Sequence, residues 1–358
     1  GVTRNVSGLV SPGPTLLSSF IDGEFRIRLL DADGTVINDW PILYHDVWGG
    51  EDTFLPENER PTTNWHVQSA GITALPDGSL VVVLKGLVRF DRCGNVMWKL
   101  PHKVHHSISV SPSGTLWTSG TRYVEGKSLH RPLRAPYKLD TLVNVSLEGE
   151  LLQEIVVLDL LWNDQWLAEL FANNRSFHPN QARDIVHLND VEEIPTEFLE
   201  KFPQFSAGDL LVSLRQSNLV LVVEPSTGRI KWHKTGPWIQ QHDPDWQPDG
   251  TISVFDNRFD KSAYGSTLGG SNIISIDPKT DDVSYLYGKD EGQHFYTKQQ
   301  GNHQILPNGN ILVNETDAGR VFEVTPSGEI VWEFINRYSD EEVIQIRDAT
   351  RYSPGYFQ

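Results

Sequence analysis

Several histidines stand at related positions, a few residues before short turns that contain proline. His106 and His242 each lie six residues before the proline of such a turn, and His303 lies four residues before Pro307. Side chains alternate between the two faces of a strand, so even separations place these histidines on one face. Imidazoles gathered on one face can ligate a metal, or can supply a nucleophile together with its acids and bases.

A fourth histidine belongs to this set. His187 opens the stretch DIVHLNDVEEI, which reads as a strand in the corresponding position of another repeat. His66 lies ten residues before Pro76, which is an even but longer separation. For His66 and His105 taken singly, ordinary burial is the better explanation. Three or four histidines converging from successive repeats are harder to explain in that way, so we predict that His187 and the first three point into one channel.

Two chemistries remain open for such a cluster. In the first, four histidines ligate a metal: His106, His187, His242 and His303. Asp243 or Asp245 would then orient the ligating imidazoles through hydrogen bonds. In the second, one imidazole is a nucleophile and the others bind an anion and move protons. Arg215, in LLVSLRQSN on the strand after His187, favours the second, because a guanidinium is unfavourable beside a divalent cation and well suited to an oxyanion.

The elements that carry these residues come from two alternating short patterns. The first is a strand, a Pro-x-Gly turn and a strand, at 75–83, 111–119, 247–255 and 306–314, with a looser copy at 206–214. The second is an acidic or small turn followed by a strand that often ends in tryptophan, at 30–40, 90–100, 145–155, 223–233, 276–286 and 324–334. Glycine supplies the positive φ of the tight turns, and the flanking apolar residues form strands.

Each pair of patterns makes about four strands with a period of about 50 residues, the size of one propeller blade. We therefore predict an all-β chain, 1–358, that forms a single six-bladed β-propeller with its active site at one end of the central channel. The first blade lacks a clear inner hairpin, and either PTLLSSF or the C-terminal EEVIQIRDATRY can supply it. The predicted blades are 15–60 with C-terminal closure, 61–101, 102–160, 180–236, 237–290 and 300–340.

Three insertions interrupt the repeats. Residues 159–174 and 195–205 have helix-like spacing, so we expect short helices over one face. Residues 120–140 form a basic stretch in an acidic protein, and a solvated loop is its simpler explanation. The functional alternative is that Arg131 and Arg134 steer an anionic substrate.

Composition limits the function classes. The formal net charge of −17 argues against a nucleic-acid partner and against binding to anionic membranes. No apolar run is long enough to span a membrane. The single cysteine, Cys93, can form no internal disulfide, which fits either a reduced compartment or a disulfide-free exported protein. The sequence does not indicate an oligomeric state.

The ordered set DIVHLNDV, SLRQSN, QHDPDWQPDGTISVFDN and GNHQILPNGNILVNETDAGRVFEVTPSGEIVWEF resembles the arylsulfate sulfotransferase family, the PAPS-independent β-propeller aryl sulfotransferases. The likeness runs from about residue 70 to the C-terminus and is strongest over 184–336. It implies ping-pong transfer of a sulfuryl group from an aryl sulfate to a phenol, with no PAPS or other cofactor. A periplasmic or secreted location follows from the same resemblance.

The resemblance also assigns roles to residues. His242 matches the nucleophile that becomes a sulfohistidine, and His187, Arg215 and Asn189 match groups that bind the sulfuryl oxygens and assist proton transfer. His106 matches the remaining active-site histidine. The doublet with His105 leaves the register of this match open, and the even offset from Pro112 favours His106. We add His303, Trp238, Arg131 and Arg134 as candidate substrate-binding residues, the tryptophan because its ring could stack on an aryl group.

The chain departs from the family pattern beside its candidate nucleophile. Asp243 and Asp245 follow His242, and their negative charge would repel a sulfate donor unless they face away or orient the imidazole. Two other function classes therefore stay open. One is a metal-dependent hydrolase, lyase or oxygenase that uses the same histidines, and the other is a non-catalytic propeller that binds an anion or a protein partner.

Overall fold

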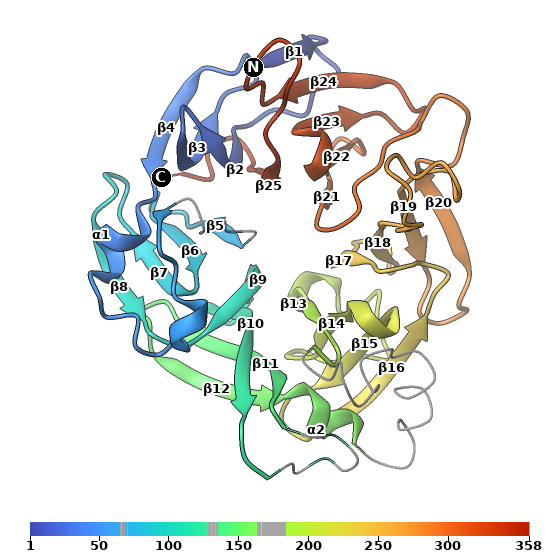
Figure 1. Ribbon diagram of the computed structural model, residues 1–358. Helices are drawn as coiled ribbons and strands as arrows, with labels where there is room; N and C mark the ends of the chain where they lie inside the picture. The colour runs from blue at the N-terminus through green and yellow to red at the C-terminus, as the bar shows by residue number, and fades with distance from the viewer. Residues whose placement is uncertain are drawn as a thin grey trace.

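Six β-sheets surround a central channel in the computed structural model, and this arrangement confirms the predicted propeller (Figure 1). The structure describes residues 1–64, 67, 69, 71–127, 130, 133, 135–162, 166 and 184–357. Within this part of the chain, all strand pairs of the six sheets are antiparallel, and the innermost strands are β25, β5, β9, β13, β17 and β21.

Three of the sheets, ordered from the channel outward, contain the following strands. They are β25 (Ile346–Arg351), β2 (Thr15–Ile21), β3 (Glu24–Leu30) and β4 (Val36–Pro41); β5 (Ile72–Ala74), β6 (Leu80–Leu84), β7 (Gly86–Phe90) and β8 (Val96–Leu100); and β9 (Val104–Val110), β10 (Thr115–Val124), β11 (Tyr137–Ser146) and β12 (Leu151–Val156).

The other three sheets follow the same order. They are β13 (Leu188–Glu193), β14 (Leu210–Leu214), β15 (Leu219–Glu224) and β16 (Arg229–Thr235); β17 (His242–Trp246), β18 (Ile252–Asp256), β19 (Asn272–Ile276) and β20 (Val283–Tyr287); and β21 (Asn302–Ile305), β22 (Ile311–Glu315), β23 (Arg320–Val324), β24 (Ile330–Ile335) and β1 (Val2–Asn5).

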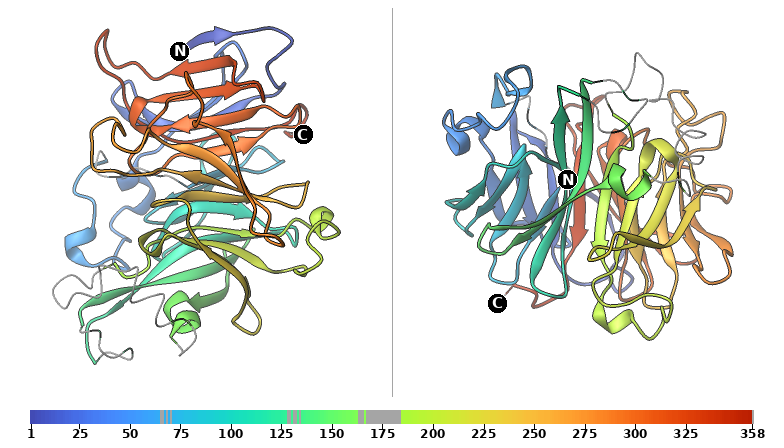
Figure 2. Two further views of the ribbon diagram at one scale, coloured as in Figure 1. Left: turned by 90° about the vertical axis from the view of Figure 1, so that its right-hand side faces the viewer. Right: turned by 90° about the horizontal axis from the view of Figure 1, so that it is seen from below.

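Both ends of the chain take part in closing the ring. β25 is the innermost strand of the first blade and pairs with β2, with Thr15 opposite Arg351 and Ser19 opposite Ile346. The inner hairpin of this blade is therefore built from both segments that the sequence offered, PTLLSSF in β2 and EEVIQIRDATRY in β25. β1 adds a fifth strand to the outer edge of the last blade, where it pairs with β24 (Figures 1 and 2).

The recurrent tryptophans of the outer strands join neighbouring blades. The indole N–H of Trp40 donates to the carbonyl oxygen of Asp91 in the next blade, at 3.1 Å, and that of Trp98 donates to Leu147 at 2.8 Å. Trp332 makes the equivalent bond from the last blade to the first, also at 2.8 Å. A buried indole N–H needs such an acceptor, and this accounts for the repeated tryptophan in the sequence.

The apolar core lies mainly between adjacent sheets rather than within one of them. Ile27 of the first blade and Val82 of the second share one buried cluster, and Leu211 and Val254 join the fourth blade to the fifth. Blade strands buried on both faces are therefore nearly continuous in apolar residues, as in β6 and β15. Each blade depends on its neighbours for burial, so the channel walls are held as one ring.

Helical structure is shorter than the sequence predicted. α2 spans Val157–Leu161, at the start of the predicted 159–174 segment, whose remainder lies mostly outside the described residues. The 195–205 segment holds only a 3-10 turn, Thr196–Phe198, followed by further turns, so the expected helix there is wrong. α1 (Tyr44–Trp48) was not foreseen. No helix in the described part of the chain has the length and apolar character needed to cross a membrane.

We predict that the buried ion pair of Arg351 and Glu323, which ties β25 to the last blade, is needed for ring closure. The two side chains lie 3.1 Å apart and are 2% and 0% exposed. Arg351→Met should lower the free energy of unfolding by about 3–5 kcal/mol, because it leaves a buried carboxylate without its cation. Urea unfolding measures this. Arg4→Met, which removes an exposed pair with Glu329, is the matched control and should cost less than about 1 kcal/mol; equal losses would contradict the prediction.

Candidate functional site

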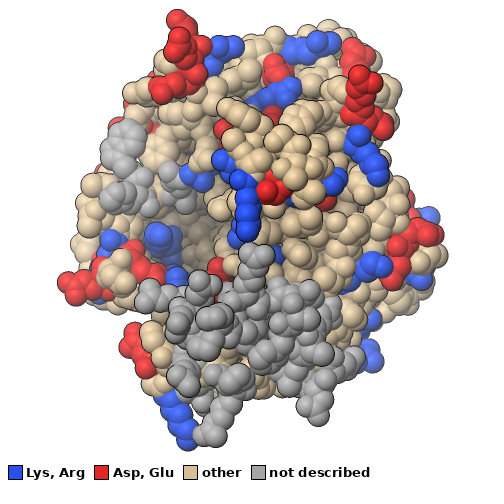
Figure 3. All heavy atoms as spheres, turned by 45° about the vertical axis from the view of Figure 1, so that its right-hand side comes forward, with Lys and Arg blue, Asp and Glu red and all other residues tan. Residues whose placement is uncertain are grey.

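A polar cavity of about 1030 Å³ occupies the channel. It is lined by residues of the innermost strands and of the segments before them, including His106, Asn189, His242, Gln300 and Arg347. The space-filling view shows a deep hollow in the propeller face that is turned toward the viewer (Figure 3). The cavity is large enough for an aryl ring with a sulfate group.

The neighbours of His242 fix which of its ring nitrogens carries the proton. His242 begins β17 and is 6% exposed, and its Nδ1 lies 2.7 Å from Oδ1 of Asn257. The Asn257 amide nitrogen donates to the carbonyl oxygens of Thr297 and Gln300, at 3.1 and 2.7 Å, so its oxygen must face the imidazole. Nδ1 of His242 is therefore the donor, and Nε2 keeps the lone pair.

The electrostatic surroundings keep His242 neutral. Burial lowers the pKa of His242 to about 3, and the charges of Arg215 and His187 act in the same direction, while the bond from Asn257 opposes them. The backbone N–H of Gln300 lies 3.3 Å from Nε2, which is a weak contact that a reacting atom can displace. An unprotonated imidazole with a defined lone pair in a cavity is equipped to act as a nucleophile.

His106 and His105 form a pair on β9. Their Nδ1 atoms lie 2.5 Å apart and their ring centroids 4.8 Å apart. Two residues of β9 bulge out where the pairing with β10 shifts, and His106 has φ of 59° there. Burial lowers the pKa of His106 well below its ordinary value, and the charges of His105, His187, His242 and Arg215 add to this effect.

His187 and Arg215 complete the cluster. The His187 ring lies 5.0 Å from that of His106, and its Nδ1 is 2.5 Å from the carboxylate of Asp184. Although burial raises the pKa of Asp184, its bond to His187 holds that pKa below the ordinary value. Arg215 is 8% exposed and donates to the side-chain oxygen of Gln240 at 2.9 Å, while its Nε has no partner. The predicted His106, His187, His242 and Arg215 are thus close enough to act on one another electrostatically, and His106 and His242 line the cavity, whereas His187 and Arg215 are not among its lining residues.

Five residues around the cavity adopt the left-handed backbone conformation, which non-glycine residues rarely do. Their φ angles are 59° at His106, 53° at His187, 56° at Gln240, 53° at Asp243 and 62° at Gln300. Such conformations cost free energy and concentrate at functional sites, where they set side-chain directions. In this protein these left-handed residues occur at the inner ends of blades, where they set the directions of the polar side chains of the cluster.

Asn189 is buried and lines the cavity. Its Nδ2 donates one hydrogen to the backbone oxygen of Gln241 at 2.8 Å, and its Oδ1 is buried without a partner. The side-chain amide nitrogen has two hydrogens, so one donor remains beside this bond. In this arrangement Asn189 holds the segment that precedes His242.

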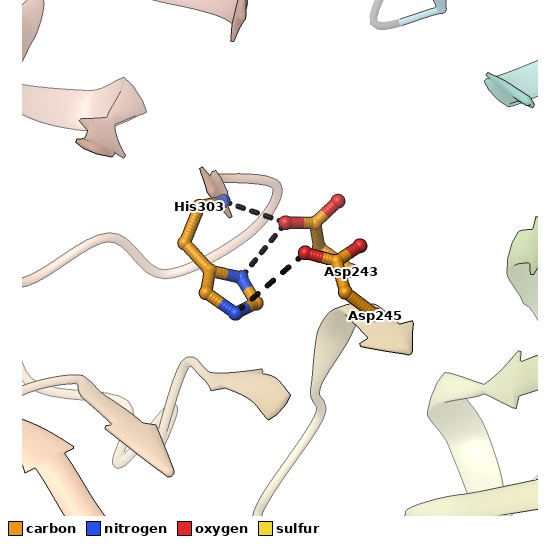
Figure 4. Close-up of side chains that lie close together, drawn as sticks. All are labelled: Asp243, Asp245 and His303. Atoms are coloured by element: carbon orange, nitrogen blue, oxygen red, sulfur yellow. Dashed lines mark hydrogen bonds and ion pairs between the residues drawn. The ribbon is translucent and has the colours of Figure 1, made fainter. Parts of the chain in front are cut away.

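His303 does not join the other histidines. Its ring is fully buried, with Nδ1 2.9 Å from the carboxylate of Asp243 and Nε2 2.7 Å from the hydroxyl of Ser253 and 3.8 Å from Asp245 (Figure 4). The backbone N–H of His303 also donates to Asp243, at 2.6 Å. His303 also lines the cavity, so its contact with substrate stays a prediction. Its expected convergence with the other three histidines is not observed, because its ring nitrogens are bound to Asp243 and Ser253.

The four-histidine metal set is not assembled either. Among the described residues, the one group of three or more ligand atoms within 4.8 Å of one another is Asp243, Asp245 and His303. Both ring nitrogens of His303 already have protein partners. These bonds account for the orientation of the group without an ion.

Carboxyl groups line the channel beside the histidines. Burial raises the pKa of Asp190 and of Asp245 well above the ordinary value, and the charge of Asp243 adds to both. The same two causes raise the pKa of Asp348 to about 8, and burial raises that of Glu192 to about 8. Each of these shifts favours the protonated form of the carboxyl group, so burial opposes the build-up of negative charge in the channel.

Other candidates are structural or lie outside the described residues. Trp238 is 1% exposed, packs in the core and donates to the carbonyl oxygen of Asn218, which accounts for its ring by packing, and its contact with substrate stays a prediction. Arg131, Arg134 and His66 lie outside the described residues. Lys138, from the same basic stretch, lies 3.3 Å from Glu59, which supports a structural role for that side chain.

The structure is a six-bladed propeller whose channel holds a neutral imidazole within the electrostatic influence of a guanidinium. The arylsulfotransferase (ASST) family model matches residues 71–337, and the chain belongs to this family. Membership implies an aryl sulfotransferase-like enzyme that acts on aryl sulfates.

Solved structures are similar to this chain in fold. A protein of unknown function from Bacteroides caccae is 12% identical, with 95% of this chain and 98% of that one covered and a TM-score of 0.57. Hydrazine synthase from Kuenenia stuttgartiensis is 14% identical, with 90% and 80% covered and a TM-score of 0.50. At these identities the likeness shows the fold alone. No curated protein matches the chain.

Sequence reasoning missed several residues that position the cluster: Asn257, Asp184, Gln240, Gln300, His105 and Asp140. Two of them left a signal. Asp184 stands three residues before His187, and His105 forms a doublet with His106. The Asn257 contact arises from strand pairing, because β18 ends beside the start of β17, and no local pattern indicates it.

We predict that His242 makes the protein less stable in mild acid. Its pKa is about 3 in the folded state and about 6.5 when unfolded. Below about pH 6.5 this histidine binds a proton in the unfolded state but not in the folded state. The free energy of unfolding therefore falls by up to about 1.4 kcal/mol per pH unit toward pH 3. Urea unfolding at pH 7, 6, 5 and 4, compared with His242→Gln, isolates this contribution. Parallel curves for the two proteins would contradict it.

Proposed function

We propose that this protein transfers a sulfuryl group from an aryl sulfate to a phenol, without PAPS or another cofactor, through a sulfohistidine at His242. The observation that carries the proposal is the bond of His242 Nδ1 to Asn257, which leaves the Nε2 lone pair in the cavity. Family membership supports the substrate class. With it we propose a periplasmic or secreted location, which fractionation of producing cells tests.

The first half-reaction exchanges an S–O bond for an S–N bond. Nε2 of His242 attacks sulfur, the bond from sulfur to the aryl oxygen breaks, and the electron pair leaves with the phenolate. A proton from His106 makes the leaving group a phenol. Because His242 starts neutral, no base has to remove a proton from Nε2.

The second half-reaction returns the enzyme to its starting state. The acceptor phenol gives its proton to His106 while its oxygen attacks sulfur. The N–S bond breaks and its electron pair returns to Nε2 of His242. One site thus serves donor and acceptor in turn, as ping-pong transfer requires.

Fixed positive charge stabilises the transferring group. Sulfuryl transfer spreads negative charge over the sulfur-bound oxygens, and Arg215, with a buried Nε that lacks a partner, has donors to offer them. Asp184 aligns His187 through Nδ1 and leaves its Nε2 for the substrate. Asp243, which follows His242 in the chain, accepts two hydrogen bonds from His303, and these bonds hold its carboxylate in place.

The metal-dependent alternative has less support, because the histidines it requires do not share one point. The non-catalytic alternative leaves the neutral, oriented imidazole of His242 without a role. Both alternatives are distinguished from sulfuryl transfer by covalent adduct formation and by the effect of a chelator.

Intact mass spectrometry after mixing with 4-nitrophenyl sulfate, with no acceptor, tests the proposal. We expect the wild type to gain the mass of one SO3 group and to lose it when a phenol is added. His242→Gln should gain none. Arg215→Gln should form the adduct about 100- to 1000-fold more slowly, the usual effect of losing one donor to a developing anion.

His45→Gln is the matched control, since His45 is exposed on α1, away from the channel. It should form the adduct at the wild-type rate. Absence of an adduct in the wild type, with no release of nitrophenol, would refute covalent sulfuryl transfer. Turnover that stops on addition of a chelator would favour the metal-dependent alternative.

A further inference from the structure

His105 contacts His106 but has no role in the proposed function. Its Nε2 lies 3.2 Å from the carbonyl oxygen of Gly120 and 3.4 Å from the carboxylate of Asp140. Asp140 is itself buried and accepts the backbone N–H of Leu188 at 3.0 Å. Both neighbours of Nε2 are acceptors, so this nitrogen carries a proton.

The contact between the two histidines then has two forms. A hydrogen bond between two ring nitrogens, in this case the Nδ1 atoms 2.5 Å apart, needs one proton between them. When His105 is neutral, His106 supplies that proton, and Nε2 of His106 has a lone pair. When His105 is an imidazolium, it supplies the proton, and Nε2 of His106 carries a hydrogen.

His106 is neutral in both forms. Its buried position, with His187, His242 and Arg215 nearby, makes an imidazolium there unfavourable. A positive charge on His105 faces the carboxylate of Asp140 instead, and Asp184 is the other carboxylate beside the cluster. The pair therefore lets His106 change from acid to base without becoming charged.

We propose that His105, oriented by Asp140, is a positioning and relay residue that stores the proton which His106 exchanges with the aryl oxygen. This inference rests on the proposed function. In the first half-reaction, Nε2 of His106 gives its proton to the departing phenolate, and Nδ1 of His106 takes one from His105. In the second, the acceptor phenol gives a proton to Nε2, and Nδ1 returns one to His105, so the cycle is balanced.

The kinetic test compares two donors whose leaving groups differ in their need for a proton. His105→Gln should slow adduct formation by about 100-fold with phenyl sulfate, which is in the range for losing a general acid. With 4-nitrophenyl sulfate, whose phenolate leaves unaided, the rate should change less than about threefold, because the lost step is the proton transfer. Asp140→Asn should also slow the reaction more with phenyl sulfate than with 4-nitrophenyl sulfate, but by a smaller factor. His45→Gln should change neither rate.

Equal loss with both donors would overturn the relay, since it would mean that His105 only holds the structure. Unchanged rates with both donors would overturn it too. Either result leaves sulfohistidine formation intact in the wild type, so it is distinguishable from failure of the proposed function. Thermal unfolding of each variant identifies any that are misfolded.

Nitrogen NMR of histidine-labelled protein tests the shared proton directly, in the absence of substrate. A scalar coupling across the hydrogen bond between the two Nδ1 nuclei is expected in the wild type and in Arg215→Gln, and should be lost in His105→Gln. If the wild type shows no such coupling, the two nitrogens do not share a proton and the inference is wrong, whether or not the protein transfers sulfuryl groups.

Discussion

Closure of the ring is the constraint on which the rest of the structure depends. The innermost strand of the first blade is β25, and it pairs with β2, which lies more than three hundred residues earlier in the chain. Blades bury their apolar faces against one another, so an open ring would expose a core face on each side of the gap. The cavity residues come from several blades and meet only when this seam is closed.

The site shows how burial selects protonation states. In water an imidazole is partly protonated near neutral pH, and a carboxyl group is ionised. In this channel both tendencies are reversed, because charged forms are disfavoured away from bulk water. His242 is thereby kept unprotonated, and the same cause shifts Asp190 and Glu192 toward their protonated forms. Arg215 keeps its charge, since a guanidinium deprotonates only far above neutral pH.

The propeller was predictable because each repeat contains the same pattern of strand-forming and turn-forming residues. His106, His187, His242 and Arg215 were predictable because each falls at a fixed offset or in a family motif. The sequence could not predict the bulges in β9 and β17, which lie at His106 and at Asp243 and change the directions of those side chains. Bulges depend on how two strands pair across space, and Trp238 shows the same limit, since core packing alone distinguishes it from a ligand-stacking ring.

Burial raises the pKa of several carboxyl groups in the channel, so these groups exchange protons closer to neutral pH than exposed carboxyls do. The formal charge of −17 counts every one of them as ionised, whereas burial favours their protonated forms. As the pH rises past about 8, Glu192 and Asp348 release their protons into a confined space that water screens poorly. Alkaline solution therefore builds a repulsive field inside the molecule, which loosens the inner strands from within and opposes the entry of anions.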